Sequence, residues 1–411
     1  MNGPPKELLT VAYSYDPEKA VGALRPRRLH KYLARLGYRI HVLAAEAVPN
    51  PSDASLTLVA DEAEAFFRMR AAERKAGRRT GWVPLRFQAE AFLKKFVLKG
   101  YFPFLWAVDA SRRAAETVKA NRGIGAVIST FPPLANHLTG MELKRRCGLR
   151  WIADYRDPMN TELSNPIVAF LEREMMHRAD VIVANTAHAG DDYRRRFPRV
   201  AHKVHVITNG FDPDDRIFAL PLPERSARVL LHAGAMYHGR NANLLVHALA
   251  HLRERGPAPA MLSLIGPVGY GAGLDEALYQ RAVAEGWLEL IPTSVPRAEA
   301  QRRTQEADAL VILQPQSVRQ IPSKLFEYIL IGRPILCLVP RASAVEEVLQ
   351  RSGVPFTCIY SDDSVPSAAE RLARFLAYPN DATPASQWFL ETFDARPQAA
   401  YLASLIEGAK Q

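Results

Sequence analysis

Strand-length apolar runs alternate with helical segments along almost the whole chain. The runs are apolar on nearly every residue rather than on every second one. They lie at residues 8–15, 38–45, 124–130, 150–155, 180–186, 203–208, 229–235, 261–266, 288–293, 307–313 and 334–340. Between them, residues 26–37, 134–148 and 241–256 carry apolar side chains at helical spacing. Strands that are apolar on both faces are typical of parallel sheets covered by helices, so the pattern predicts a doubly wound α/β fold.

The number of strands and the chain length predict two domains. A chain of 411 residues with 48% hydrophobic content is long for one core, and the strands are too many for one sheet. The break is expected at residues 211–228, which are rich in Asp, Pro and Arg. We place a first domain at 1–215, a second at 226–388 and a last helix at 389–411. Two Rossmann-like sheets would then face each other across a cleft, with ligands beyond the carboxyl ends of their strands.

Cysteine usage and the N-terminus point to the cytoplasm. Cys147, Cys337 and Cys358 have no paired spacing, so neither a disulfide framework nor a zinc site is expected. The N-terminus lacks the basic stretch and apolar core of a secretory signal, and no segment reaches the roughly 18 apolar residues of a spanning helix. We expect a cytoplasmic protein, soluble or peripheral at the inner membrane face.

The formal net charge of +10 is concentrated in residues 68–99, which contain ten Lys or Arg and two Glu. This stretch has no aromatic-interleaved or helix-turn-helix pattern, so nucleic acid is not the expected partner. Within it, residues 87–99 combine an apolar helical stripe with flanking lysines. The stripe is Ala89, Phe92, Leu93, Phe96 and Val97, and the lysines are Lys94, Lys95 and Lys99. The pattern fits either an amphipathic helix on an anionic membrane surface or a buried helix with a solvated edge.

Residues 320–328, QIPSKLFEY, follow a predicted strand and open a helix. With Ser323 as N-cap, free amides, a hydroxyl and the Lys324 ammonium meet at a helix N-terminus, which suits a phosphate. Glu327 follows one turn later, where it can accept hydrogen bonds from two ribose hydroxyls. The alternative is a capping box between Ser323 and this glutamate, which requires no ligand.

Residues 234–240 follow the first strand of the second domain. A side chain at Gly234 would block a diphosphate there, and Arg240 can bind phosphate oxygens bidentately. Otherwise Gly234 only turns the chain and Arg240 is solvated.

Residues 154–157 end a strand of the first domain. Asp154, Arg156 and Asp157 then lie at the cleft and bind an acceptor, or they form an internal Arg–Asp pair that fixes the loop.

Together these segments resemble a GT-B glycosyltransferase of the retaining family 4, the glycosyl transferases group 1, in a branch associated with bacterial polysaccharides. The resemblance covers nearly the whole chain. It rests above all on PSKLFEYILIGRPIL (322–336), which is similar to the donor-site helix of the family. The other segments are KVHVITNGFD (203–212), the 234–240 loop, TFPPLANH (130–137), WIADYRDP (151–158) and FPFLWAVDA (102–110).

The resemblance implies transfer of a sugar from a UDP, GDP or dTDP donor to a hydroxyl, with retention at the anomeric carbon and without metal or cofactor. Glu327 would hold the ribose, while Ser323 and Lys324 would meet the diphosphate. Arg240 would stabilise the departing β-phosphate. Front-face attack, with the leaving diphosphate accepting the proton, would need no dedicated base.

The resemblance also implies roles for four further residues. Backbone groups of Ser294 and Val295 would contact the base, and Gly22 matches the glycine loop that faces donor and acceptor. His137 would lie near the reacting sugar, or would be a helix-face histidine satisfied by a neighbour.

One departure from the family concerns position 319. The family carries a glutamate eight residues before the ribose-binding one, and this chain has Arg319 there. Gln314, Gln316 or Gln320 would then position the sugar, or the sugar differs. An arginine here would suit an acidic sugar or an acceptor phosphate.

The acceptor that we expect is a lipid-linked saccharide in polysaccharide or glycoconjugate synthesis. One alternative is a sugar-nucleotide epimerase or hydrolase of the same fold, which would use Asp154, Asp157 and Glu162. Another is a non-catalytic partner protein, favoured by Arg319 and opposed by the intact phosphate cradle. The resemblance also implies that the last helix crosses back to the first domain, although its apolar residues fit a core helix equally well.

Overall fold

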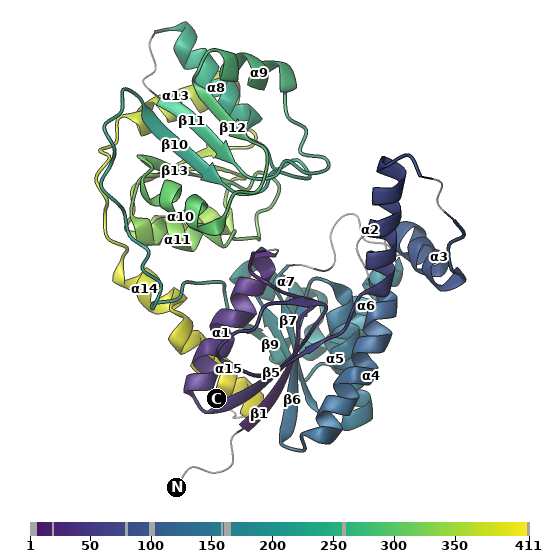
Figure 1. The fold of residues 1–411 in the computed structure, drawn as a ribbon. Helices are drawn as coiled ribbons and strands as arrows, with labels where there is room; N and C mark the ends of the chain where they lie inside the picture. Colours follow the sequence, from purple (N-terminus) through teal and green to yellow (C-terminus); the bar gives the residue numbers. More distant parts are fainter. Residues whose placement is uncertain are drawn as a thin grey trace. The chain divides into compact units, whose positions relative to one another are not determined.

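The strand-length runs form two parallel sheets in the computed structural model, one in each of two units (Figure 1). The structure describes residues 6–18, 20–78, 81–97, 103–157, 159, 166–256 and 260–408. Unit 1 is Met1–Thr208 with Ala395–Gln411, and unit 2 is Asn209–Asp394. The prediction of two doubly wound α/β domains is confirmed.

Unit 1 contains a seven-stranded sheet in the order β5-β3-β1-β6-β7-β8-β9, and all its neighbouring strands are parallel. The strands are β1 (Lys6–Val11), β3 (Tyr38–Ala44), β5 (Asp53–Leu58), β6 (Ile124–Phe131), β7 (Arg150–Tyr155), β8 (Val181–Ala184) and β9 (Val204–Val206). A small separate pair joins β2 (Ser14–Tyr15) to β4 (Glu46–Ala47). The strand order reverses between β1 and β6, and such a switch point is where open α/β sheets bind ligands.

Helices cover both faces of this sheet because successive residues of each strand are apolar. Leu9 and Val11 of β1 belong to one core, and Leu8 belongs to the other. The first core takes residues from α4 and α5, and the second from α1 and α15. The helices are α1 (Leu24–Arg35), α2 (Glu62–Lys75), α3 (Leu85–Phe92), α4 (Phe104–Ala120), α5 (Leu134–Cys147), α6 (Pro166–Arg178), α7 (Ala187–Arg196) and α15 (Ala395–Glu407), with the short turns η1 (Val21–Ala23), η2 (Leu93–Val97) and η3 (Pro198–Lys203).

The last helix returns to unit 1 and packs beside α1 (Figure 1). Its residues Ala399, Leu402 and Leu405 are buried in the same core as Leu29 and Leu33 of α1. Unit 1 therefore depends on both ends of the sequence for one of its two cores.

Unit 2 contains a six-stranded parallel sheet in the order β12-β11-β10-β13-β14-β15. The strands are β10 (Arg228–Ala233), β11 (Ala260–Ile265), β12 (Leu288–Ile291), β13 (Ala309–Leu313), β14 (Ile335–Val339) and β15 (Phe356–Tyr360). The order reverses between β10 and β13, whose pairing extends only to Leu231. The carboxyl ends of β10 and β13 therefore border the switch point of this unit.

Helices also cover both faces of the second sheet. One core takes residues from α8, α9 and α13, and the other from α11, α12 and α14. The helices are α8 (Asn243–Glu254), α9 (Glu276–Ala284), α10 (Arg297–Gln305), α11 (Lys324–Ile331), α12 (Ala344–Ser352), α13 (Val365–Leu376) and α14 (Gln387–Phe393).

The unit boundaries lie at Thr208/Asn209 and Asp394/Ala395, whereas the sequence suggested 215, 226 and 389. Residues 389–394 belong to unit 2 because Phe389 and Phe393 pack in its core against Phe326. The amide of Phe211 donates to the carbonyl of Phe393, so the outgoing and returning segments run side by side within unit 2.

Helices α2 and α3 stand out from the rest of unit 1 as a helical pair (Figure 1). In α3, Phe87 and Glu90 face inward and are buried, and the Glu90 carboxylate accepts the amide of Leu105 at the start of α4. Of the predicted stripe, Ala89 is exposed, Phe92 is 57% exposed and Leu93 is half-buried. The side chains of Phe96 and Val97, and residues 98–99, lie outside the described part. The alternative of a stripe buried in the protein is therefore wrong for Ala89 and Phe92.

Among the residues that the structure describes, none of the helices is long and apolar enough to cross a membrane.

Candidate functional site

The carboxyl ends of β10, β11 and β12 are tied together by backbone hydrogen bonds. The amide of Gly234 donates to Ile265 over 2.8 Å, and that of Gly266 donates to Ile291 over 3.0 Å. Gly266 has φ +138°, and a Cβ on it would lie 2.3 Å from the Gly234 carbonyl oxygen, so only glycine allows this approach. The loops that carry predicted residues Gly234, Ser294 and Val295 thus share one edge of the sheet.

Gly234 makes room for a histidine. A Cβ at this position would lie 3.0 Å from Nε2 of His232, the residue two before it on β10. The sequence argument required glycine here for the approach of a diphosphate, and the structure gives a reason within the protein itself.

Arg240 is held by a neutral side chain. Its Nη2 donates to Oε1 of Gln314 at the end of β13, and its guanidinium lies 4.9 Å from the centre of the Tyr237 ring. The loop before it is held by Gln316, whose Nε2 donates to the Gly239 carbonyl over 3.3 Å. Within the described ranges Arg240 makes no ion pair, so its positive charge is not compensated by a carboxylate.

The same geometry accounts for two of the glutamines that the sequence offered as sugar ligands. Gln314 is 2% exposed, its oxygen accepts from Arg240, and its Nε2 donates to Gln320 over 3.2 Å. Both the oxygen and the nitrogen of this side-chain amide are therefore hydrogen-bonded, and the oxygen positions Arg240. Gln316 instead holds the loop 237–240 through its hydrogen bond to Gly239.

Helix α11 begins at Lys324, directly after Ser323. The Ser323 side chain makes no capping bond, and Glu327 pairs with Lys324, whose Nζ lies 3.1 Å from Oε2. The capping-box alternative is therefore wrong. Lys324 and Glu327 are both partly exposed, at 30% and 25% of their side-chain surface, so both are accessible to a ligand at the helix N-terminus.

The remaining predicted residues of unit 2 lie on neighbouring loops. Ser294 is exposed and Val295 is half-buried, in the loop between β12 and α10. Arg319 lies in the loop between β13 and α11, where its amide donates to the Ser317 hydroxyl over 3.3 Å. Arg319 thus belongs to the same loop as Gln314 and Ser323.

His232 is a residue of this edge that the sequence did not single out. Its Nδ1 lies 2.9 Å from the carbonyl of Val311 on β13, so Nδ1 carries the proton, and Nε2 has no hydrogen-bond partner among the residues that the structure describes. Burial lowers the pKa of His232 to about 4, and the nearby charges of Arg240 and Lys324 act in the same direction. The ring is thus neutral and fills the gap between β10 and β13. The sequence signal that could have identified His232 is its position as a lone polar residue within the apolar run 229–235.

In unit 1, two predicted residues from distant segments are brought together. The Arg156 guanidinium extends from the end of β7 across the loop after β6, where Nε donates to the Phe131 carbonyl over 3.2 Å and Nη2 to that of Pro132. It reaches Gly22 in η1, beyond the end of β1. A Cβ on Gly22 would lie 1.8 Å from Nη1 of Arg156. The two residues therefore meet at the switch point between β1 and β6.

Asp154 faces inward and forms a buried ion pair. Its carboxylate binds the Arg25 guanidinium through two contacts, of 3.1 and 2.9 Å, and the two side chains are 9% and 4% exposed. Arg25 also donates to the carbonyls of Ile207 and Thr208, the last two residues before the chain enters unit 2. Of the two alternatives for Asp154, this geometry favours the internal pair, although the partner is Arg25 rather than Arg156. Asp157 follows at the edge and is half-buried.

His137 is fully buried at the start of α5. Trp151 Nε1 donates to the Ser129 hydroxyl over 2.7 Å, and that hydroxyl lies 2.8 Å from Nδ1 of His137. Burial lowers the pKa of His137 to about 3, with a further contribution from the charge of Arg156. A neighbour thus satisfies Nδ1, whereas the buried Nε2 has no hydrogen-bond partner among the described residues, and a catalytic role for His137 stays a prediction.

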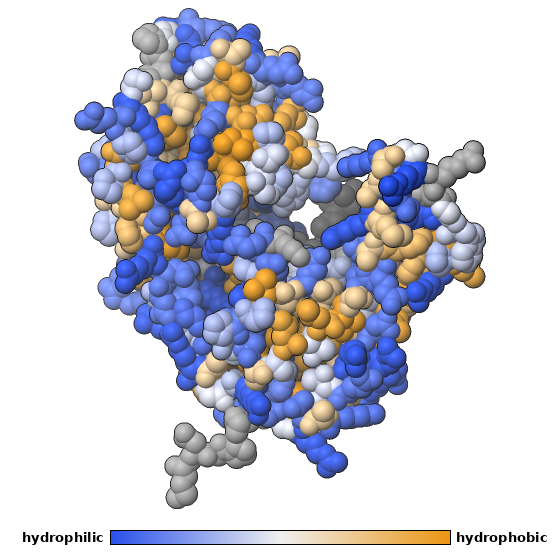
Figure 2. Space-filling model, viewed as in Figure 1, coloured by the Kyte–Doolittle hydropathy of each residue, from blue (hydrophilic) through white to orange (hydrophobic). Residues whose placement is uncertain are grey.

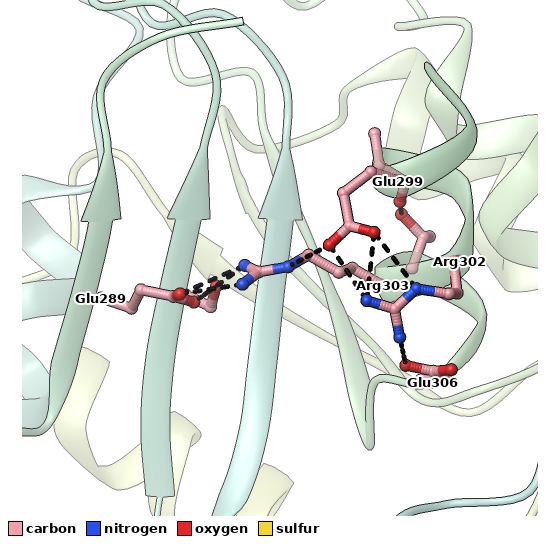
Figure 3. A network of polar contacts seen from close by, with 8 residues as sticks. Glu289, Glu299, Arg302, Arg303 and Glu306 are labelled. Atoms are coloured by element: carbon pink, nitrogen blue, oxygen red, sulfur yellow. Dashed lines mark hydrogen bonds and ion pairs between the residues drawn. The ribbon is translucent and has the colours of Figure 1, made fainter. Parts of the chain in front are cut away.

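A second polar network lies away from this edge, on one face of the sheet of unit 2 (Figure 3). Arg303 of α10 reaches over the strands to both oxygens of Glu289, while Arg302 bridges Glu299 and Glu306. All of these residues except Glu299 line a cavity of about 580 Å³ beside the first half of β10 and β11. Their charges are paired with one another, so the network serves the packing of α10 more directly than it serves a ligand.

Among the described residues, no group of three or more His, Cys, Asp or Glu side chains is placed to hold a metal ion.

Comparison with known proteins identifies the fold. Residues 26–215 match the family model Glycosyltransferase Family 4. Sucrose-phosphate synthase from Thermosynechococcus elongatus is 14% identical with a TM-score of 0.63, over 98% of each chain. HepE from Anabaena, solved with UDP and glucose, is 12% identical with a TM-score of 0.65, over 98% of this chain and 100% of that one. The lipopolysaccharide outer core galactosyltransferase WaaB, in its apo form, is 13% identical with a TM-score of 0.61, over 98% and 100%. None of the curated protein sequences matches the chain.

Proposed function

We propose that the protein transfers a sugar from a nucleoside diphosphate to a hydroxyl group, because residues 26–215 match the family model Glycosyltransferase Family 4 and the fold is that of GT-B glycosyltransferases. The proposal rests on Arg240 and Lys324, whose charges both act on His232 at the switch point of unit 2, and on the N-terminus of α11, which begins at Lys324. Two of the compared proteins are a sucrose-phosphate synthase and a galactosyltransferase, and a third was solved with UDP, which supports a donor of this class.

The chemistry of this edge suits a departing diphosphate. Cleavage of the sugar–phosphate bond builds negative charge on the leaving group, and fixed positive groups lower the barrier when they stand where that charge develops. Arg240 is oriented by a neutral amide, so its full charge is available. The amides that begin α11 add the positive end of a helix dipole. These groups account for the departure without a metal ion, and the diphosphate itself accepts the proton of the acceptor in a front-face reaction that retains the anomeric configuration.

Glu327 suits the ribose. Its carboxylate is bound to Lys324 across one turn of α11 and is partly exposed. In our proposal the two ribose hydroxyls donate to Glu327 while the ammonium of Lys324 turns to the diphosphate, so the ligand replaces an internal pair with two external contacts. Backbone groups of Ser294 and Val295 at the neighbouring loop end then contact the base.

Calorimetric titration of the full chain tests the donor site. UDP, GDP and dTDP are titrated into the wild-type protein and the Glu327→Ala variant, with inorganic pyrophosphate as a ligand that lacks ribose. We expect one nucleotide to bind tightly, the variant to bind it about 10-fold more weakly, and pyrophosphate binding to be retained, because one charge-assisted hydrogen bond contributes about 1.5–3 kcal/mol. Glu370→Ala, which breaks a comparable surface pair with Arg374 on α13, is the matched control.

Failure of all three nucleotides to bind a folded protein would overturn the proposal and favour the non-catalytic partner, the alternative that Arg319 supports. Consumption of the nucleotide sugar without any acceptor would instead identify an epimerase or hydrolase of the same fold.

For the acceptor, we propose a lipid-linked saccharide at the inner membrane face, in polysaccharide or glycoconjugate synthesis. The support is the outward-facing surface of α2 and α3, where hydrophobic and hydrophilic residues adjoin (Figure 2). Trp82 is 76% exposed, Leu85 72% and Phe92 57%, beside basic residues of the stretch 68–99. Apolar side chains that enter an interface between anionic headgroups, with basic residues around them, are the signature of peripheral attachment.

A further inference from the structure

Arg156 presents a nitrogen atom that no group in the described part of the chain uses. Two of its three guanidinium nitrogens donate to the carbonyls of Phe131 and Pro132, which fixes the plane of the group. The third, Nη1, lies over Gly22 and makes no hydrogen bond in the described part of the chain, yet it is not among the buried polar atoms without a partner. It is therefore accessible while the rest of the group is held rigidly.

Carboxylates offset the charge of Arg156 only in part: Asp157 and Asp154 act on it through space. Arg156 makes no ion pair within the described ranges, and its anchors are neutral carbonyl oxygens. Burial lowers the pKa of Arg156, which reflects the cost of holding this charge away from water. Arg25, buried in the same unit, has Asp154 as a bidentate partner. Within the described ranges no carboxylate binds Arg156 in that bidentate way, so its third nitrogen stays available to a ligand.

The surroundings add positive potential and space. Gly22 belongs to η1, directly before α1, so the positive end of that helix points to the same place. Gly22 is not in a left-handed conformation, so its backbone does not require glycine. A side chain there would instead collide with the Arg156 guanidinium. The group stands at the carboxyl edge of the sheet, at the switch point between β1 and β6.

We propose that Arg156 and the Gly22 turn form an anion subsite of unit 1 that binds one phosphate or carboxylate group of the acceptor. Nη1 donates to an oxygen of that group, and the start of α1 supplies the second attraction. The subsite limits the acceptor to molecules with an anionic group near the reacting hydroxyl, such as a sugar linked through a phosphate or a uronic acid. That the anionic group belongs to the acceptor rests on the proposed function. The existence of the anion subsite does not rest on it.

Protection against an arginine reagent tests the subsite in the wild-type protein. The full chain is treated with phenylglyoxal, and modification of Arg156 is followed by peptide mass spectrometry without ligand, with inorganic phosphate and with glucuronate, each also in saturating UDP. We expect phosphate or glucuronate to slow modification of Arg156 at least 5-fold, in the presence of UDP as in its absence. Modification of exposed Arg113 should not change.

Binding of phosphate, followed by ³¹P NMR in the Arg240→Gln background, gives a second measure free of the donor site. Arg156→Gln should weaken the remaining binding about 10-fold, and Gly22→Ala should do the same because its Cβ displaces the guanidinium. Arg113→Gln is the control.

The outcomes separate the two proposals. Unchanged phosphate binding in folded Arg156→Gln, or equal modification rates with and without anions, would overturn the subsite. Protection by UDP alone would assign the subsite to the donor diphosphate and overturn the acceptor assignment. Loss of nucleotide binding with Arg156 still protected by phosphate would defeat the proposed donor function and leave the subsite standing.

Discussion

The guanidinium of Arg240 donates to the side-chain amide of Gln314, and no carboxylate is paired with it in the described part of the chain. A neutral partner orients the arginine without neutralising it. An acidic partner in the same position would bind it more strongly and remove the charge that a diphosphate needs.

Replacing Gln314 by Glu is therefore expected to lower kcat of sugar transfer about 10- to 100-fold, because the new carboxylate competes with the developing charge of the leaving group. Gln314→Leu removes the anchor without adding charge and should cost less. Initial rates at saturating donor compare the two variants. Equal activity of the two would show that orientation, and not net charge, is what Gln314 provides.

Removal of Arg25 is expected to destabilise unit 1 by about 3–5 kcal/mol, because Asp154 would remain buried without its partner. The carbonyls of Ile207 and Thr208 would also lose their donor. Urea unfolding of Arg25→Met against the wild type measures the loss. Arg113→Met, which breaks an exposed pair with Glu116, should change stability by less than about 1 kcal/mol, and a similar effect of both variants would contradict the structural role of the pair.

The two buried histidines predict a loss of stability in acid. An unfolded histidine titrates near pH 6.5, whereas His232 does so at about 4 and His137 at about 3 in the folded chain. The unfolded state thus binds more protons below pH 6.5, and stability falls as the pH decreases from there toward 4. Each histidine should lower the free energy of unfolding by about 2 kcal/mol between pH 7 and pH 5.

Unfolding midpoints measured across this range should fall less steeply in His137→Asn and His232→Asn than in the wild type. Parallel curves for all three proteins would mean that neither histidine remains neutral in the folded state.

Attachment to anionic vesicles should depend on the exposed apolar side chains of α3 and the segment before it. The double variant Trp82→Ser, Leu85→Ser is expected to bind such vesicles at least 10-fold more weakly, since each large apolar side chain contributes about 1.5–3 kcal/mol on burial. Co-sedimentation with anionic and neutral vesicles at two salt concentrations gives the measurement. Leu36→Ser, an exposed leucine just after α1, is the control. Equal sedimentation of all variants would remove this surface from the proposal.

Substitution of Leu402 by Ala is expected to cost about 2–5 kcal/mol, because this side chain is 4% exposed in the core that α15 shares with α1. The effect should appear in the unfolding of unit 1. A loss below about 1 kcal/mol would mean that the last helix is not an integral part of that core.

The interior strands were predictable from sequence and the edge strands were less so. Strand β7 has the limits of its apolar run, residues 150–155, because both faces of an interior strand are buried. The edge strands β5 and β15 were not among the predicted runs. Every residue of β5 is at least partly exposed, and β15 is buried only at Cys358 and Ile359, so neither needs a continuous apolar sequence.

The candidate site was predictable where its residues are local. Ser323, Lys324 and Glu327 lie within one turn of a helix and were found together. The contacts that orient the arginines join distant segments: Arg240 meets Gln314 74 positions away, and Arg156 meets Gly22 across several strands. Such contacts leave no local pattern, because they depend on which strand ends the fold brings to one edge. The burial of His137 left no local pattern for the same reason, since it packs with Trp151 and Ser129.

The return of α15 to unit 1 bears on how the chain is made. Synthesis on the ribosome delivers α1 early, but the residues from Ala399 to Ile406 that complete its core emerge only after the whole of unit 2. Unit 2, whose first and last segments meet at Phe211 and Phe393, has all its parts before then, and domains generally fold as units during synthesis. The unit that begins first is therefore finished last, and until then the apolar face of α1 is available to chaperones.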